Sequence, residues 1–189
     1  MATVNKRSSA HKPACPVCRN SNFDILDILV RHAKGVAIHV CAGCELTYLW
    51  PQPTPETLAA FYAAEYRDIY DDQTPAERHK QDLLEARLRV ARIAPLLAGD
   101  ERLLEIGCGS FAFLKTVASM VGTAVGIEPD DKTRAWFAGS SDLRTLPDIS
   151  ALTPNNGPFD LIVMFHVLEH LPDPVHYLSH LRNLLSPNG

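Results

Sequence analysis

Short apolar runs alternate with amphipathic stretches through the second half of the chain. The apolar runs are typical of buried strands and occupy residues 102–106, 124–127, 143–146 and 159–165. The stretches after them carry apolar residues at helical spacing, at about 111–121, 132–138 and 175–185. Regular alternation of strand and helix is typical of a parallel sheet with helices on its faces. We therefore predict an α/β domain with a four-stranded parallel sheet over residues 101–189.

Two helix starts precede this domain. Thr54 followed by Pro55 is the favoured order for a helix cap and first turn, and predicts a helix over 56–66. Thr74 and Glu77 have the spacing of a capping box, and an apolar stripe at helical spacing follows them. The stripe consists of Leu83, Ala86, Val90, Ile93 and Leu97. We expect this second helix to pack on the sheet.

The N-terminal part of the chain has β-rich runs at residues 23–30, 36–40 and 46–50. About 40 residues cannot bury enough apolar surface to be stable without a further constraint. Two Cys-x-x-Cys pairs, about 22 residues apart, supply one, and they consist of Cys15, Cys18, Cys41 and Cys44. Such pairs place four thiolates around one Zn²⁺, which predicts a zinc ribbon with a structural metal.

Two disulfides or four unliganded thiols are the competing readings of these cysteines. The first ten residues are polar and basic, and no apolar segment typical of a signal peptide follows them. We therefore favour zinc over disulfides and expect a cytoplasmic protein. No run of about 20 apolar residues occurs, so we expect no membrane span.

The charged residues of the ribbon indicate whether it is suited to bind nucleic acid. The net charge is −4, and the segment from Cys15 to Cys44 holds Arg19, Arg31 and Lys34 against two acidic residues. Zinc ribbons that bind nucleic acid need a basic face, so the charge argues against nucleic acid as a partner. Hydrophobic residues make up 46% of the chain, which is enough for an ordinary core.

A glycine loop follows the first strand of the α/β domain. Gly107 and Gly109, with Ala112, satisfy the dinucleotide pattern Gly-x-Gly-x-x-Gly/Ala, and Glu128 stands about 20 residues later, after the second strand. This pattern fits a nicotinamide or an S-adenosylmethionine site. Glu105 separates the two, because an acid there repels a pyrophosphate and favours the ammonium and sulfonium of S-adenosylmethionine.

Four segments in this order resemble class I S-adenosylmethionine-dependent methyltransferases: 104–109, 125–130, 159–174 and 181–189. The chain is similar to members with an N-terminal zinc-binding domain, including bacterial sugar C-methyltransferases. The resemblance implies a seven-stranded Rossmann-like sheet whose last strands this chain lacks. Ser186-Pro-Asn-Gly189 has the character of a loop that leads into a further strand, so we expect a C-terminally truncated chain.

The predicted fold class is thus an incomplete Rossmann-like parallel sheet with flanking helices, preceded by a small zinc ribbon. We expect a flexible N-terminus over 1–13, the ribbon over 14–50, and a linker with helices that pack on the core over 51–100. The partial S-adenosylmethionine-binding domain follows over 101–189. The oligomeric state is not predicted.

The resemblance also implies roles for individual residues. It places Glu105, Gly107 and Gly109 around the methionine moiety and Glu128 on the ribose, with Asp148 as a candidate for the adenine amino group. The family loop commonly has a third glycine where this chain has Phe111, so we expect a narrower or differently angled pocket floor.

Three polar residues follow the fourth predicted strand, where ligands of open α/β sheets collect. They are His166, Glu169 and His170. If the acceptor must lose a proton, one of these side chains is the candidate base. In the competing interpretation they shape the cofactor wall or cap the next helix.

We therefore expect methyl transfer to a small-molecule acceptor, such as a nucleotide-linked sugar. An NAD-linked oxidoreductase would keep the glycine loop and Glu128 but has no use for Glu105. We also weigh an RNA methyltransferase with a zinc module and a non-catalytic zinc scaffold against this expectation.

Overall fold

The computed structural model describes residues 14–28, 35–52, 54, 56–57, 74–138, 143–171 and 173–189. The chain divides into two compact units, one of residues 1–65 with 169–177 and the other of residues 66–168 with 178–189. The domain boundaries expected from the sequence stay predictions. Among the described residues, no helix is long and apolar enough to cross a membrane.

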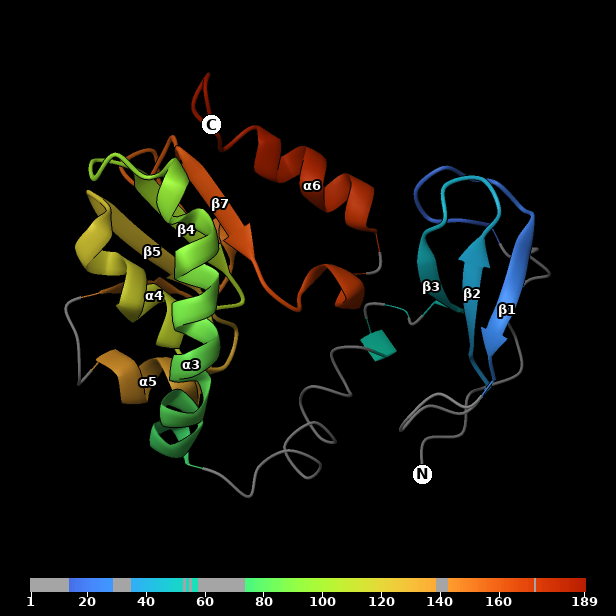
Figure 1. Ribbon diagram of the computed structural model, residues 1–189, viewed down its shortest axis with the longest axis horizontal. Helices are drawn as coiled ribbons and strands as arrows, with labels where there is room; N and C mark the ends of the chain where they lie inside the picture. The colour runs from blue at the N-terminus through green and yellow to red at the C-terminus, as the bar shows by residue number, and fades with distance from the viewer. Residues whose placement is uncertain are drawn as a thin grey trace. The chain divides into compact units, whose positions relative to one another are not determined.

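The N-terminal unit contains a three-stranded antiparallel sheet (Figure 1). Its strands, in spatial order, are β1 (Phe23–Asp27), β2 (Ala37–Cys41) and β3 (Thr47–Trp50). The buried hydrophobic residues of this unit form a small cluster of Cys15, Cys41 and Tyr48, with Leu46 and Trp50 packed against it. Because two of the three cluster residues are cysteines, the hydrophobic core alone is too small to stabilise the sheet.

β1 is shorter than the predicted run over 23–30. A register irregularity between Ile25 and Asp27 interrupts its pairing with β2, which resumes with Asp27 opposite Ile38. Residues 29–34 lie outside the described part of the chain. The other two strands match their predicted runs within one residue at each end.

The second unit is built on a four-stranded sheet in which all neighbouring strands are parallel. In spatial order the strands are β6 (Arg144–Leu146), β5 (Thr123–Ile127), β4 (Arg102–Ile106) and β7 (Leu161–Met164). The chain moves outward from β4 on one side through β5 and β6, and then returns to the other side of β4 as β7. Ligands of such sheets bind beyond the carboxyl ends of the strands at this switch point. The predicted α/β parallel sheet is confirmed.

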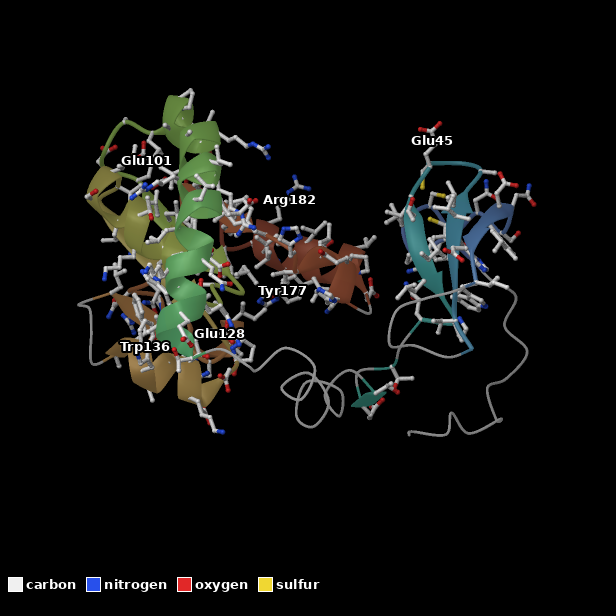
Figure 2. All side chains as sticks on the ribbon, turned by 60° about the horizontal axis from the view of Figure 1, so that its bottom comes forward. Glu45, Glu101, Glu128, Trp136, Tyr177 and Arg182 are labelled. Carbon is white, nitrogen blue, oxygen red and sulfur yellow. The ribbon has the colours of Figure 1, made fainter. Side chains whose placement is uncertain are left out.

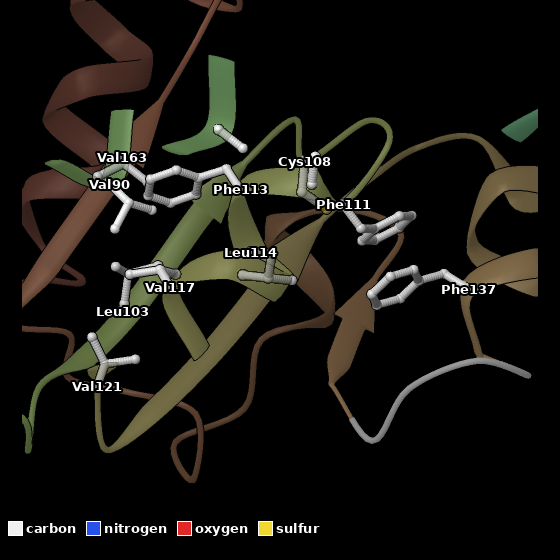
Figure 3. Close-up of a cluster of buried hydrophobic side chains, with 12 residues drawn as sticks. Val90, Leu103, Cys108, Phe111, Phe113, Leu114, Val117, Val121, Phe137 and Val163 are labelled. Carbon is white, nitrogen blue, oxygen red and sulfur yellow. The ribbon is translucent and has the colours of Figure 1, made fainter. Parts of the chain in front are cut away.

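Two helices cover one face of this sheet, α3 (Pro75–Ile93) and α4 (Ala112–Val117), and they pack against each other (Figure 1). The capping box at the start of α3 is confirmed, since Thr74 accepts from the Glu77 N–H while the Glu77 carboxylate accepts from the Thr74 N–H at 2.7 Å. The predicted stripe is also confirmed, because Ala86 and Val90 are buried. Figure 3 shows Val90 in one cluster with side chains of β4, α4 and β7.

Several helices are shorter than their sequence patterns. α3 gives way to a 3₁₀ turn at Ala94–Leu96, which includes Pro95, and α4 to another at Ala118–Met120. The remaining helices are α5 (Asp131–Ala138) and α6 (Pro174–Arg182). α6 ends before the predicted residue 185 because the next three N–H groups bond to carbonyls three residues back.

The predicted fourth strand over 159–165 is likewise trimmed to β7. Phe159 donates to the Leu184 carbonyl at 2.8 Å and accepts from the Ser186 N–H at 2.7 Å. Its backbone therefore pairs with residues 184–186 in an isolated bridge and not with β4.

The helix predicted over 56–66 is described only at its start. Residues 56 and 57 are helical, and the Thr57 N–H donates to the Thr54 hydroxyl at 3.2 Å, as expected for a cap. The rest of that helix lies outside the described residues, as does the predicted flexible segment over 1–13.

Candidate functional site

The four cysteines of the ribbon come together at the two turns that flank its strands. Their sulfur atoms all lie within 4.8 Å of one another. The Sγ atoms of Cys15 and Cys44 are 3.6 Å apart, and those of Cys18 and Cys41 are 3.4 Å apart. Figure 2 shows the sulfur atoms gathered at the end of the ribbon that carries Glu45.

Each pair of cysteines lies in the same kind of tight turn. Cys15 accepts from the Arg19 N–H at 3.0 Å, and Cys41 accepts from the Glu45 N–H at 2.9 Å. Arg19 and Glu45, which directly follow the second cysteine of each pair, both have left-handed backbone conformations, with φ of 63° and 61°. The two turns therefore present their sulfurs in matching geometry.

This geometry fits a tetrahedral metal and excludes two disulfides. All five cysteines are free, and the sulfur separations far exceed the roughly 2.05 Å of a disulfide. A Zn²⁺ with Zn–S bonds of about 2.3 Å needs sulfurs about 3.8 Å apart, close to the observed separations. Burial raises the pKa of the Cys41 thiol, but hydrogen bonds from the N–H groups of Cys44 and Gly43 and from neighbouring thiols lower the pKa to about 7. At Cys44 the Leu46 N–H lowers the pKa, but the neighbouring sulfurs and burial outweigh it and raise the pKa to about 12, so without a metal the cluster holds its negative charge mainly on Cys41.

The glycine loop lies at the carboxyl end of β4, at the switch point of the larger sheet. The N–H groups of Gly107 and Cys108 both donate to the Ile127 carbonyl, at 2.8 and 3.0 Å, which ties the loop to the end of β5. Gly107 has φ of 69°, and a Cβ there would lie 2.5 Å from the Val167 side chain. Only glycine meets both conditions, so the backbone of this loop stays bare.

Glu128 connects the loop to the end of β5. One carboxylate oxygen accepts from the Gly109 N–H at 2.8 Å, and the other accepts from the Asp130 N–H at 2.9 Å. Burial raises the pKa of this carboxyl group, while the two N–H donors act in the opposite direction. Each carboxylate oxygen has a second lone pair, so the group can still accept from two ligand hydroxyls.

Glu105 is the most unusual group of the site. It lies in β4 with 3% of its surface exposed, and its Oε2 is buried without a hydrogen-bond partner. Burial raises its pKa well above the ordinary value; Arg89 lowers it and Glu128 raises it. A buried carboxylate oxygen without a partner is costly, and it is suited to bind a cationic ligand group.

We expect Glu105→Gln to stabilise the ligand-free protein at pH 7, because burial makes ionisation of the wild-type carboxyl group less favourable in the folded state than in the unfolded state. The carboxyl group is protonated in both folded and unfolded states below its ordinary pKa of 4.5, so the two proteins should have similar pH dependence there. As the pH rises above 4.5 toward the raised folded pKa, only the wild type loses stability from this group. Denaturant unfolding from pH 4 to 8 measures this, and parallel curves for both proteins would contradict it.

Phe111, which occupies the place of a third glycine, adopts the backbone conformation that a glycine would. Its φ is 60°, and its ring is fully buried and stacked on Phe137 with centroids 4.0 Å apart (Figure 3). The ring packs into the core between the loop and α5, and the expectation of a narrower or differently angled pocket floor stays a prediction.

Asp148 follows β6 and is exposed. Its carboxylate caps the short 3₁₀ turn at Ile149–Ala151 and accepts from the Ser150 N–H at 2.7 Å. The Ser150 hydroxyl and N–H lower the pKa of this carboxyl group. The Glu128 N–H donates to the Leu146 carbonyl at 3.0 Å, so Asp148 follows a strand whose end is bonded to the Glu128 segment. Its role toward adenine stays a prediction.

The three candidate catalytic residues lie beyond the carboxyl end of β7 and are exposed. His166 has a left-handed conformation with φ of 55°, and Glu169 and His170 belong to a 3₁₀ turn at Leu168–His170. The contact between Val167 and Gly107 brings the start of this segment beside the glycine loop. Their part in proton transfer stays a prediction.

Several site residues were not predicted from the sequence. The Arg134 guanidinium donates to the Glu128 carbonyl and pairs with Asp131. On α3, the Arg89 guanidinium lies 4.6 Å from the centre of the Phe165 ring, and His79 lies 2.8 Å from the Ser110 carbonyl. One signal could have found His79, since it continues the apolar stripe of Leu83 and Ala86 by one turn.

Comparison with known proteins agrees with this arrangement. The profile of a family described as "Methyltransferase domain" matches residues 77–189. The ubiquinone biosynthesis O-methyltransferase of Thiobacillus denitrificans is 30% identical over 112 residues, which cover 54% of this chain and 47% of that protein. The enzyme of the same name from Caulobacter sp. is 32% identical over 95 residues, covering 47% of this chain and 38% of that protein. The chain thus spans less than half the length of these curated relatives.

Solved structures show the same fold. The plantazolicin methyltransferase BpumL, in complex with a monoazolic desmethylPZN analog and SAH, has a TM-score of 0.50 and 17% identity, covering 68% of this chain and 52% of that chain. Its complex with a triazolic analog and SAH also has a TM-score of 0.50, with 13% identity and the same coverage.

Proposed function

Because the chain belongs to the methyltransferase domain family, whose profile matches residues 77–189, we propose that it transfers a methyl group from S-adenosylmethionine to a small-molecule acceptor. The observation that carries the proposal is the pairing of a buried carboxyl group, Glu105, and a half-buried one, Glu128, with a bare glycine loop. Glu105 keeps one oxygen without a partner, and Glu128 bonds to the loop at Gly109.

The residues present fit the cofactor that the family uses. A Cβ at Gly107 would meet Val167, so the backbone there is open only because the residue is glycine. In the proposal, the unpartnered oxygen of Glu105 faces the ammonium of the methionine moiety, and the remaining lone pairs of Glu128 accept from the ribose hydroxyls. When bound, the cofactor supplies a methyl group already activated by its positively charged sulfur.

The work left to the protein is alignment and, for some acceptors, proton removal. The glycine loop and the two carboxylates fix the cofactor, so the acceptor needs only to be held in line with it. His166 and His170 are the proposed proton acceptors because they follow β7 in sequence, on either side of Val167, which lies against Gly107. Glu169, in the same turn, is proposed to position them.

The acceptor class is the finer part of the proposal. The relatives named ubiquinone biosynthesis O-methyltransferases favour oxygen as the acceptor atom. The resemblance to sugar C-methyltransferases with a zinc-binding domain favours a nucleotide-linked sugar. Transfer of label from methyl-labelled S-adenosylmethionine to a panel of catechols and keto-sugar nucleotides separates the two classes.

The ribbon is proposed to hold one structural Zn²⁺ through Cys15, Cys18, Cys41 and Cys44. All four positions of a tetrahedral ion are then filled by protein, which leaves no site for a catalytic water.

Calorimetric titration of the zinc-loaded chain with S-adenosylmethionine, S-adenosylhomocysteine and NAD tests the cofactor. Micromolar binding of both adenosyl ligands without binding of NAD is the expected result. A preference for NAD would favour an oxidoreductase and contradict the role given to Glu105. Binding of none of the three by a folded, zinc-loaded chain would favour the non-catalytic scaffold.

A further inference from the structure

Ser110, the residue after the second glycine of the loop, is held by two side chains of α3. The Ser110 carbonyl lies 2.8 Å from the Nδ1 atom of His79, and the Ser110 hydroxyl donates to the Asp82 carboxylate at 2.6 Å. A carbonyl only accepts, so Nδ1 of His79 carries the proton in this contact. Ser110 is 7% exposed and His79 is half-buried, whereas Asp82 is exposed.

The same stretch of the loop also packs against α5. The His79 ring lies at a tilt to the Trp136 ring, with centroids 6.1 Å apart, and Phe111 stacks on Phe137. Residues 110 and 111 are therefore held between α3 and α5. We call His79, Asp82 and Ser110 the loop latch.

The loop has a physical need for such support. Phe111 adopts a left-handed conformation, which costs a non-glycine residue about 1–2 kcal/mol, and Gly107 and Gly109 also have positive φ. A backbone in this state persists only when its surroundings fix it. Where a third glycine would adopt this conformation without strain, the chain instead has a strained residue flanked by two side-chain hydrogen bonds and a ring stack.

Resting on the proposed function, we propose that His79 and Asp82 are positioning residues that set the glycine loop for the cofactor. Ser110 directly follows Gly109, whose N–H donates to Glu128 at 2.8 Å. Fixing the carbonyl and hydroxyl of Ser110 fixes the direction of this N–H and the path of the bare loop backbone. α3 thereby contributes to the cofactor site through the loop, without touching the cofactor.

The test compares substitutions that keep each hydrogen bond with substitutions that remove it. In His79→Asn the amide nitrogen can take the place of Nδ1, and in Asp82→Asn an oxygen still accepts from Ser110. His79→Leu and Asp82→Leu abolish the bonds, Ser110→Ala removes only the hydroxyl, and Gln81→Leu is a control at an exposed position of the same helix.

Two measurements are made on the zinc-loaded chain. Amide hydrogen exchange over residues 107–112 reports the loop without ligand, and titration with S-adenosylhomocysteine reports the site. We expect the two leucine variants to exchange about tenfold faster there and to bind about 5- to 20-fold more weakly. The exchange rates and affinities of the asparagine variants and of Gln81→Leu should stay within about threefold of the wild-type values.

The proposal would be overturned if the asparagine variants lost as much exchange protection and affinity as the leucine variants, since the loss would then follow from altered packing and not from the hydrogen bonds. Unchanged affinity despite faster exchange would overturn it too. If a leucine variant fails to fold, Ser110→Ala replaces it in the test. We then expect faster exchange and weaker binding in Ser110→Ala, both by smaller factors than those given for the leucine variants. Failure of the wild type to bind S-adenosylhomocysteine would contradict the proposed function, whereas the exchange measurement would still decide whether the latch holds the loop.

Discussion

Replacing Cys41 with serine is expected to remove the metal and unfold the three-stranded sheet. Cys41 is 1% exposed, lies at the end of β2, and its backbone N–H donates to the Leu46 carbonyl at 2.9 Å. In the described part of the ribbon, the buried hydrophobic cluster consists of its two buried cysteines and Tyr48, with Leu46 and Trp50 packed against it. Structural zinc supplies about 10–16 kcal/mol of apparent binding energy in small domains, more than such a sheet gains from burial.

Metal content by mass spectrometry and amide exchange over residues 14–28 and 35–50 measure the effect. We expect one zinc per wild-type chain, and less than about a tenth of that in Cys41→Ser together with loss of exchange protection. Cys108→Ala is the matched control, because Cys108 is the one cysteine outside the cluster and should leave the zinc in place. Full zinc occupancy in Cys41→Ser, or a wild type folded without metal, would contradict the proposed site.

Glu128→Ala is expected to weaken binding of S-adenosylhomocysteine at least 100-fold. The substitution removes the acceptor of two backbone N–H groups, those of Gly109 and Asp130, and the proposed acceptor of the ribose hydroxyls. Hydrogen bonds to a charged group contribute about 1.5–3 kcal/mol each, so loss of two of them to the ligand exceeds a factor of 100. Calorimetric titration against the wild type gives the ratio directly.

Glu101→Ala is the control for this variant. The Glu101 carboxylate also accepts from two backbone N–H groups, those of Ala98 and Gly99, but it precedes β4 and lies at the other end of the sheet (Figure 2). Its loss should leave affinity for the adenosyl ligand unchanged. Equal losses in the two variants would show that Glu128 acts through stability alone.

The pH dependence of binding provides a second check on Glu128. Burial raises the pKa of this carboxyl group above 4.5, and only the ionised form accepts from both hydroxyls. Affinity should therefore fall as the pH is lowered through the raised pKa, and this fall should be absent in Glu128→Ala. A pH profile that is the same in both proteins would assign the titration to another group.

Elements whose limits are set by nearby residues were predictable from the sequence. β4 matches its predicted range of 102–106, because a run with the apolar residues Leu103, Leu104 and Ile106 stops at the loop that begins with Gly107. The helix start at Thr74 was predictable for the same reason, since the two residues of its capping box, Thr74 and Glu77, are three positions apart. The limits of β7 could not be predicted in this way. Phe159 pairs with Leu185, which is far away in sequence, and a local sequence pattern cannot indicate such a pairing.

The candidate site also contains residues that local sequence motifs predict and residues that only long-range contacts bring together. Glu105, Gly107 and Glu128 belong to short motifs at the ends of β4 and β5, so spacing was enough to find them. His79 and Asp82 were missed because they meet Ser110 across 31 and 28 positions of sequence. Such contacts follow from how α3 packs against α4, which hydrophobic periodicity predicts only as a face and not as individual pairs.

The burial of Cys108 has a practical consequence for thiol chemistry. It is 5% exposed, and burial raises its pKa strongly, so it offers almost no reactive thiolate. The remaining cysteines are those of the proposed zinc cluster, which a bound metal protects from alkylating reagents. Counting the sulfhydryls that an alkylating reagent labels under native conditions would therefore report metal loading, rising from near zero to four as the ion is withdrawn by a chelator.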